Sequence, residues 1–281
     1  MIFDTKPTVV GHRGFGSGES RGCRENTIDS YLAAISHGLS WIELDVQRSL
    51  DDQLVIRHDP VTPDGDFLVT RTAEQLASYG ILRFEDVMAA LPTGVAVNID
   101  VKTVIEDATD PAHRRTAALV ADALREHQER RRLFVSSFDP SLLMILQNRK
   151  NTIDRVPLGL ITWLNFPSHH GIAAAANMGL DAICMHTGTF GLRRERPRPT
   201  DHAVERVIDM AHRAGLEILA WVPDPADAVR LARAGADALC VDDVPGVLAA
   251  LVESGQAPGQ GRRQNLGDLR LGMFCGRLFP G

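Results

Sequence analysis

Two histidines of this sequence lie where short apolar runs end, and charged side chains lie in comparable places. His12 and Arg13 come directly after Val9 and Val10, and His58 ends the apolar run 54–58. The other members of the set are Glu43, Asp45, Asp100 and Lys102. Carboxylates hold divalent cations, imidazoles transfer protons, and Arg or Lys side chains bind phosphate oxygens. This combination suits metal-assisted cleavage of a phosphodiester.

Glu43 and Asp45 stand two residues apart in the apolar run Trp41–Val46, so on a strand both side chains point to the same side. At the carboxyl end of a buried strand they would form a hard-oxygen site for Mg²⁺ or Ca²⁺. The alternative is a pair of exposed acids on an edge strand. The flanking apolar residues favour the buried strand, where two acids need a cation or a base beside them.

Asp100 and Lys102 repeat this spacing, and with Asn98 they share one face of the run Val95–Lys102. Lysines make up only three of the 30 basic residues, which marks Lys102 as an unusual choice. We expect Asp100 to complete the cation shell and Lys102 to face the negative charge of phosphate oxygens. A structural ion pair between the two is the alternative.

His12 and His58 are the candidate proton-transfer groups. A lone histidine is more often a packing or capping residue, but these two lie at strand ends beside Arg13 and Asp59. Unperturbed imidazole titrates near pH ~6.5, so one ring can accept a proton while the other donates one. His186 also follows an apolar run and is a further candidate for the pocket.

Eight apolar runs alternate with stretches of helical period, which is typical of parallel strands joined by crossover helices. The predicted strands are Thr8–His12, Trp41–Val46, Val95–Val101, Leu133–Ser136, Leu158–Ile161, Ala182–Met185, Glu217–Val222 and Ala238–Val241. The predicted helices are Ile28–Ser36, Ala112–Glu129, Pro140–Asn148, Ser168–Met178, Asp201–Ala214 and Pro225–Ala234. In a closed parallel barrel the carboxyl ends of all strands meet on one face, so residues far apart in sequence can share one pocket.

We therefore predict an α/β fold, a single (β/α)8 TIM barrel over residues 7–255. The run Leu54–His58 follows a short polar turn and is expected to pair back on the second strand as a hairpin. The Gly- and Ser-rich segment Gly14–Arg24 is expected to form a mobile loop over the pocket mouth. Residues 256–281 are interpreted as a tail outside the barrel, either disordered or docked on a groove.

Bulk composition narrows the class of protein. Of 281 residues, 44% are hydrophobic and 23% charged, which is ordinary for a soluble globular protein. A net charge of −6 argues against a general nucleic-acid binder. No run approaches the ~18 apolar residues of a membrane span, and the N-terminus shows no secretory signal. The four cysteines are scattered along the chain, and Cys184 and Cys240 are predicted to be buried thiols. Together these features predict a cytoplasmic protein with reduced cysteines.

Eight short motifs occur in a fixed order along the chain. They are His12-Arg13-Gly14, Glu25-Asn26-Thr27, Glu43-Leu44-Asp45, His58-Asp59-Pro60, Asn98-Ile99-Asp100-Val101-Lys102, Ser136-Ser137-Phe138-Asp139, Trp221 and Val241-Asp242-Asp243-Val244-Pro245. Together they resemble the glycerophosphodiester phosphodiesterase family over roughly Val9 to Leu251. Each tripeptide is weak evidence by itself, whereas the ordered set is specific.

The resemblance implies a TIM barrel that hydrolyses glycerophosphodiesters to sn-glycerol 3-phosphate and an alcohol, using one divalent cation, Mg²⁺ or Ca²⁺. By position it assigns the cation to Glu43, Asp45 and Asp100. It makes His12 and His58 the acid–base pair and places Arg13 and Lys102 on the phosphate. From their aromatic side chains, we expect Trp221 and Phe138 to supply an apolar wall for the glycerol carbons or an acyl chain. The expected partner is a small glycerophosphodiester or lysophospholipid substrate.

Some positions depart from the family pattern and keep alternatives open. Asp100 stands where the family usually has Glu, and an Asp followed two residues later by Lys is also similar to the sphingomyelinase D branch of the same superfamily. The segment between His58 and Glu85 is short, so the insertion that covers the glycerol moiety is expected to be largely missing. A lysophospholipase D or sphingomyelinase D activity is therefore one alternative. A catalytically silent barrel that binds phosphate ligands is another.

Overall fold

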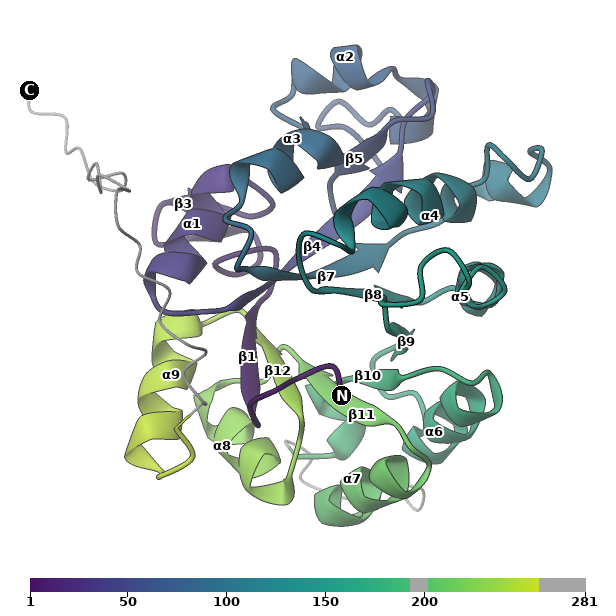
Figure 1. The fold of residues 1–281 in the computed structure, drawn as a ribbon. Coiled ribbons are helices and arrows are strands. Elements are labelled where there is room, and N and C mark those ends of the chain that lie inside the picture. Colours follow the sequence, from purple (N-terminus) through teal and green to yellow (C-terminus); the bar gives the residue numbers. More distant parts are fainter. Residues whose placement is uncertain (193–201, 258–281) are drawn as a thin grey trace, which may run out of the picture.

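The computed structural model of the protein describes residues 1–192 and 202–257, and within them eight parallel strands form a closed barrel (Figure 1). The strands are β1 (Thr8–Gly11), β4 (Trp41–Arg48), β7 (Ala96–Val101), β8 (Leu133–Ser137), β9 (Leu158–Thr162), β10 (Ala182–His186), β11 (Glu217–Trp221) and β12 (Ala238–Val241). Strand β1 closes the barrel because it pairs in parallel with β12 on one side and β4 on the other. The predicted TIM barrel is confirmed.

Alternation along each strand divides the core into two layers. On β4, Ile42 and Leu44 pack in the large cluster between barrel and helices, whereas Glu43 and Asp45 point into the barrel and line its pocket. A second apolar cluster fills the barrel interior below that pocket, with Trp41 among its members. The polar side chains of β4 therefore begin where the apolar filling of the barrel ends.

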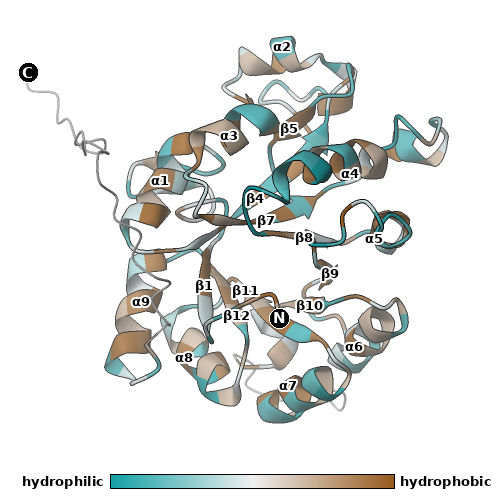
Figure 2. Ribbon diagram, viewed as in Figure 1, coloured by the Kyte–Doolittle hydropathy of each residue, from teal (hydrophilic) through white to brown (hydrophobic). Residues whose placement is uncertain are grey.

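Helices surround the barrel, with brown apolar stretches on the ribbons that pack against the strands (Figures 1 and 2). Within the described residues they are α1 (Ile28–Ser36), α2 (Ala73–Ala77), α3 (Phe84–Ala90), α4 (Thr116–His127), α5 (Pro140–Gln147), α6 (Ser168–Asn177), α7 (Val204–Arg213), α8 (Pro225–Ala234) and α9 (Val244–Glu253). Asp139, Asp224 and Asp243 each cap a helix that has Pro in its first turn. These Asp caps and prolines fix where the chain turns from strand to helix.

The structure corrects several predicted boundaries. Helix α4 begins at Thr116, not at Ala112, because Arg115 is extended and the Thr116 N–H donates to the Asp107 carboxylate at 2.8 Å. Helices α2, α3 and α9 were not predicted. The segment Gly14–Arg24 contains a small antiparallel pair, β2 (Glu19–Ser20) with β3 (Cys23–Arg24). Residue 201 and most of the predicted tail, residues 258–281, lie outside the described residues.

The predicted hairpin on the second barrel strand is confirmed. Strand β5 (Leu54–Ile56) pairs antiparallel with β4, and β6 (Leu82–Arg83) extends the sheet by one strand. The chain between them packs a small apolar core of its own, which includes Leu68 and Leu76. Only His58 and Pro60 of this segment line the pocket, so it leaves most of the mouth uncovered.

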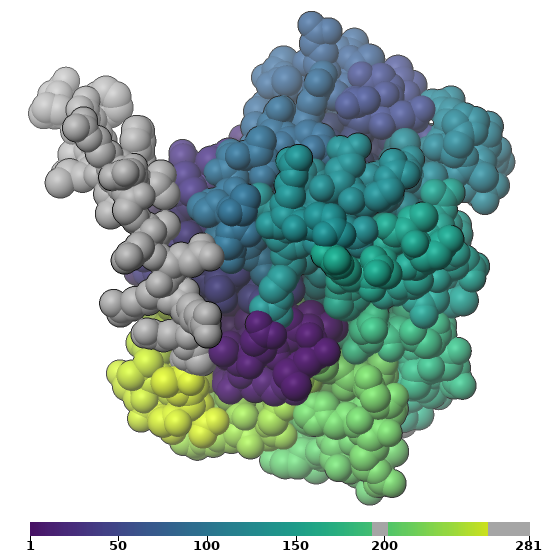
Figure 3. All heavy atoms as spheres, viewed as in Figure 1, coloured from purple at the N-terminus to yellow at the C-terminus, as the bar shows by residue number. Residues whose placement is uncertain are grey.

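The first residues close the other end of the barrel. Phe3 is fully buried and packs against Trp41 and Phe134, with ring centroids 5.2 and 5.9 Å apart. The Glu217 carboxylate accepts hydrogen bonds from the backbone N–H groups of Ile2 and Phe3 at 2.7 and 3.1 Å. The N-terminal atoms, purple in Figure 3, accordingly lie on the face opposite the pocket. None of the described helices is long and apolar enough to cross a membrane.

Candidate active site

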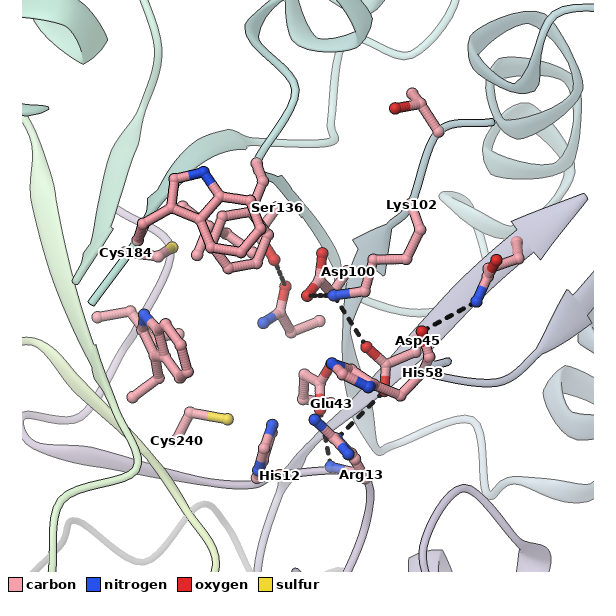
Figure 4. A pocket seen from close by; sticks show the side chains of 18 of the residues that line it. His12, Arg13, Glu43, Asp45, His58, Asp100, Lys102, Ser136, Cys184 and Cys240 are labelled. Atoms are coloured by element: carbon pink, nitrogen blue, oxygen red, sulfur yellow. Dashed lines mark hydrogen bonds and ion pairs between the residues drawn. The ribbon is translucent and has the colours of Figure 1, made fainter. Parts of the chain in front are cut away.

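One cavity of about 360 Å³ opens at the carboxyl ends of the barrel strands, and Figure 4 shows it from close by. All eight site residues expected from the sequence line this cavity. They are His12, Arg13, Glu43, Asp45, His58, Asp100, Lys102 and Trp221. Residues separated by up to 209 positions thus meet because parallel strands direct their carboxyl ends to one face.

Three carboxylates form the deepest polar group of the pocket. The register of β4 and β7 places Asp45 directly opposite Asp100, and Glu43 lies one inward position earlier on β4. Each carboxylate offers an oxygen, and these atoms all lie within 4.8 Å of one another. Glu43, Asp45 and Asp100 are 3%, 1% and 8% exposed, so their charges are largely removed from water. The alternative of exposed acids on an edge strand is therefore wrong.

The chemistry of this group fits a hard cation. Burial, followed by the neighbouring Asp45 charge, raises the pKa of Glu43 to about 8. Burial also raises the pKa of Asp100, whose Oδ1 atom is buried and has no hydrogen-bond partner among the described residues. Oxygen ligands with unsatisfied negative charge are what Mg²⁺ and Ca²⁺ bind. The acidic triad could therefore hold a metal ion.

Lys102 already neutralises part of this charge. Its Nζ atom forms ion pairs with Asp100 and, at 3.1 Å, with Asp45. Burial opposes the charged form of Lys102, but the two carboxylates outweigh it and raise the pKa of the ammonium group. Burial favours the neutral form of Asp45, but the positive charges of Lys102 and Arg13 outweigh it and lower the pKa of this carboxyl group overall. The ion pair that the sequence left as an alternative is thus present, inside the pocket.

The turn after β1 brings Arg13 to the acids. Arg13 adopts φ +49°, and its backbone N–H donates to the Glu43 carboxylate at 2.7 Å. Its side chain lies between Glu25, at 2.9 Å, and Asp45, at 3.4 Å. Gly14 follows at φ +93°, where a Cβ atom would lie 2.4 Å from the Ser30 hydroxyl oxygen. Glycine is required here because both the conformation and the space exclude a side chain.

His12 is held by the carboxylate of Asp242, for which the sequence predicted no role. Its Nδ1 atom lies 2.7 Å from Oδ1 of Asp242, which follows β12 and also accepts from the Ser17 N–H at 2.8 Å. Burial lowers the pKa of His12, but the Asp242 hydrogen bond and the Glu43 charge outweigh it and raise the pKa overall. The same contact lowers the pKa of Asp242 to about 2 despite burial. The sequence showed the motif that contains Asp242, but it did not show that Asp242 contacts His12.

His58 occupies the more open side of the pocket, with 37% of its side chain exposed. Its Nδ1 atom lies 2.8 Å from the Asp59 carboxylate. Gln47, the next inward residue of β4 after Asp45, donates from Nε2 to the backbone carbonyls of Arg57 and His58, both at 2.9 Å. Gln47 thereby ties the loop that carries this imidazole to the strand that carries the acids.

Asn26 and Tyr31 support the acids from behind. Asn26, at φ +55°, donates from Nδ2 to Asp45 at 2.9 Å, and the Tyr31 hydroxyl donates to Asn26 Oδ1 at 3.0 Å. Both residues are buried. The sequence predicts Asn26 or Thr27 as the cap of α1. The structure gives the cap to Thr27, whose side chain accepts from the Ser30 N–H, and leaves Asn26 to hold Asp45.

The other wall of the pocket is apolar. Phe138 stacks on Trp163 with ring centroids 4.3 Å apart and meets Trp221 edge-on at 6.1 Å. Cys184 and Cys240 lie at the base of this wall, across the pocket from the carboxylates (Figure 4). Burial raises the pKa of both thiols, in accord with their prediction as buried thiols. The indole Nε1 of Trp221 is buried without a hydrogen-bond partner among the described residues.

His186 is one step removed from the pocket. Its Nδ1 atom accepts from the Gly188 N–H at 2.8 Å, and its ring meets that of Trp221 edge-on at 4.5 Å. It is not among the residues that line the cavity. The structure therefore places His186 behind the apolar wall, in a supporting position.

Comparison with known proteins identifies the family. Residues 12–245 match the model of the glycerophosphoryl diester phosphodiesterase family. The chain belongs to this family. A glycerophosphodiester phosphodiesterase of Caldanaerobacter subterraneus subsp. tengcongensis is 24% identical over 269 residues, which cover 89% of this chain and 99% of the relative. The resemblance seen in the sequence is confirmed, and the protein is a phosphoric diester hydrolase.

Solved structures share the same fold. A glycerophosphodiester phosphodiesterase from Thermotoga maritima has a TM-score of 0.63 at 20% identity, covering 85% of this chain and 95% of that one. A phosphodiesterase from Oleispira antarctica, in complex with the product sn-glycerol-3-phosphate, has a TM-score of 0.67 at 22% identity, covering 88% and 97%. Family membership thus supports an enzyme over the silent barrel.

Proposed function

We propose that this protein hydrolyses glycerophosphodiesters to sn-glycerol 3-phosphate and an alcohol, with one divalent cation and a pair of histidines. The observation that carries the proposal is the convergence of three buried carboxylates, two imidazoles and two cationic side chains in one pocket. The product in the Oleispira antarctica structure supports the choice of substrate. The cytoplasm remains the predicted compartment.

Glu43, Asp45 and Asp100 would hold the cation, Mg²⁺ or Ca²⁺. The unpartnered Asp100 Oδ1 and the raised pKa of Glu43 both indicate excess negative charge that the described cations leave uncompensated. When bound, the ion supplies Lewis-acid polarisation of the phosphoryl oxygens. Asp100 is shorter by one methylene than the Glu usual in the family, but its carboxylate still offers an oxygen within 4.8 Å of those of Glu43 and Asp45.

His12 and His58 would transfer the protons. Asp242 engages Nδ1 of His12 and Asp59 engages Nδ1 of His58, which leaves the Nε2 atom of each ring for proton exchange with the substrate. One imidazole accepts a proton from the attacking hydroxyl group and the other donates one to the leaving alcohol. The attacking group is either a water or the neighbouring glycerol hydroxyl. In the second case the alcohol leaves as a cyclic phosphate forms, and a water then opens that ring to give sn-glycerol 3-phosphate.

Arg13 and Lys102 would bind the phosphate, and Trp221 would bound the apolar part of the substrate. Both cations lie beside Asp45 and are largely shielded from solvent, with side chains 14% and 18% exposed. Charge-assisted hydrogen bonds are stronger in such surroundings than in water. The phosphate would therefore sit between the acids and the aromatic wall.

An activity panel tests this function. Glycerophosphocholine and related diesters are assayed with chelator, and then with Mg²⁺ or Ca²⁺ added back. We expect release of sn-glycerol 3-phosphate that stops with chelator and returns with one of the two cations. If chelator leaves the turnover of all the diesters unchanged, the metal assignment is wrong. If none of the diesters is hydrolysed, the proposed function is wrong.

A lysophospholipase D activity is the second candidate, and the exposed part of the aromatic wall favours it. Trp163 is 66% exposed and Leu164 is 53% exposed, so an apolar surface continues from the pocket to the outside of the mouth. An acyl chain would cover this surface. Release of choline from lysophosphatidylcholine, with glycerophosphocholine left intact, would replace the first proposal by this one.

A further inference from the structure

A second cavity, of about 460 Å³, lies at the amino ends of β7, β8 and β9. Its wall includes Gly94, Arg132 and Pro157, which come just before these three strands. It shares no lining residue with the active site, which opens at the carboxyl ends of the same strands. We call this cavity the basic floor pocket and define it by its charged lining residues, Glu129, Arg130, Arg131, Arg132 and Arg155.

The charge of the basic floor pocket is opposite to that of the whole chain. Four guanidinium groups and one carboxylate line it, although the protein carries a net charge of −6. Three of the arginines are consecutive, in the loop between α4 and β8. A concentration of one charge sign around a cavity raises the local concentration of ligands of the other sign. The cavity therefore favours anions.

Arg131 contributes a fixed charge beneath the cavity. Only 8% of it is exposed, and its Nη2 atom donates to the backbone carbonyls of Met88 and Leu91 at 2.8 and 3.1 Å. Its Nε and Nη1 atoms have no hydrogen-bond partner, and it forms no ion pair, within residues 1–192 and 202–257. Burial lowers the pKa of this guanidinium, as expected for a charge without a counter-ion. A nearby anion would supply the missing compensation.

Arg130 and Arg155 supply donors that a ligand can reach. Arg130 is exposed and forms no ion pair with another described residue. Arg155 pairs with Glu129, and both side chains of this pair are 60% exposed. An ion pair so open to water is weak and exchanges readily for another anion. Arg132, in contrast, forms an ion pair with Asp4 and packs over the Trp41 ring at 5.3 Å. Its side chain is therefore held in place at the edge of the cavity.

We propose that the basic floor pocket binds a small phosphate-bearing anion, either inorganic phosphate or a phosphomonoester, through Arg130 and Arg155 over the fixed charge of Arg131. The planar fork of a guanidinium group matches two phosphate oxygens at once. The volume is larger than one phosphate group needs, and Ile2 and Leu133 add apolar wall, so an organic phosphate also fits. The inference is independent of the reaction proposed for the other face.

The test is a calorimetric titration of the full chain with inorganic phosphate and, separately, with sn-glycerol 3-phosphate. The active site also presents cations to phosphate, so all proteins carry Arg13→Gln, which weakens binding there. Arg130→Gln/Arg155→Gln is compared with Arg125→Gln/Arg213→Gln, which removes the same charge from exposed positions outside both cavities. All four positions are exposed, and equal melting temperatures will verify that both variants fold.

We expect the floor variant to bind the probe at least about tenfold more weakly than its parent and the control variant to bind as the parent does. Tighter binding of sn-glycerol 3-phosphate than of inorganic phosphate would identify an organic phosphate as the ligand, and equal binding would identify the phosphate group alone. Unchanged affinity in the floor variant would overturn the proposal. So would an equal loss in both variants, because that would show a general effect of net charge.

Discussion

The two walls of the active-site pocket are built in different ways. The wall formed by β1, β4 and β7 carries buried charges, and Glu43, Asp45 and Lys102 are each fixed by directional polar contacts. The opposite wall carries Phe138 and Trp163, which hold each other by ring stacking. Trp163 is largely exposed, whereas the acids are nearly inaccessible to water.

This difference separates chemistry from substrate choice. Buried polar groups must keep their partners, so a shift in one is transmitted to the others. Stacked rings tolerate small displacements and bind whatever apolar surface is offered. We infer that the polar wall determines the reaction and the aromatic wall determines which alcohol or acyl group is accepted. Variants in the two walls should therefore fail in different ways.

The largest effect is expected from the imidazoles of the polar wall. His12→Ala and His58→Ala should each lower kcat by ~10²–10⁴, because a positioned proton donor or acceptor is lost. The measurement is turnover of glycerophosphocholine, with the melting temperature as a check on folding. His113→Ala, an exposed histidine outside the pocket, is the matched control. Wild-type rates in either pocket variant would remove that histidine from the mechanism.

Glu43 should make the stability of the cation-free protein depend on pH. Its folded-state pKa, about 8, exceeds its ordinary value of 4.5, so its contribution is present below pH 4.5 and is lost as pH rises through 8. Unfolding in urea with chelator should show a decrease on the order of a few kcal/mol between pH 5 and pH 8.

Two comparisons sharpen this measurement. Glu43→Gln should be much less sensitive to pH over the same range, because the amide does not ionise. Added Mg²⁺ or Ca²⁺ should restore stability to the wild type at pH 8, since a bound cation stabilises the ionised carboxylate. An equally steep pH dependence in Glu43→Gln would assign the effect to another group.

A substitution of Asp242 tests whether this carboxylate positions His12 for the reaction. Asp242→Asn should reduce kcat about ten- to hundredfold, because the carboxylate that orients His12 is replaced by a neutral amide. It should also move the limb of the pH profile governed by His12 to lower pH, because Asp242 raises the pKa of that ring. Asp243→Asn keeps the His12 contact and is the control. A lower kcat with an unmoved pH profile would indicate a purely structural role.

The smallest effect is expected from the aromatic wall. Trp163→Ala should leave the reaction intact and lower the rate on lysophosphatidylcholine relative to glycerophosphocholine by about three- to tenfold, because apolar contact area is lost. Met210→Ala, which alters an exposed apolar side chain on α7, is the control. Equal losses on both substrates would place Trp163 in the machinery common to all substrates.

Periodicity made much of this protein predictable from sequence. The alternation in Trp41–Val46 indicated which side chains of β4 face inward, and the structure places Glu43 and Asp45 there. The same reasoning applied to Asp100 on β7. It missed α2 and α3, which span only five and seven residues and are too short to show a clear helical period. Helix α2 packs in the small core of the segment after β5, whereas α3 places Phe84 and Val87 in the main core.

The sequence by itself determined the strand count, the inward-facing charges and the histidines, because these follow from local period and residue type. Only the tertiary structure decided that Asp242 holds His12, that Lys102 lies between two acids, and that Arg131 is buried with no counter-ion among the described residues. These contacts depend on which strands become neighbours when the barrel closes and on how side chains share the enclosed space. Neither property is encoded in any short segment of the chain.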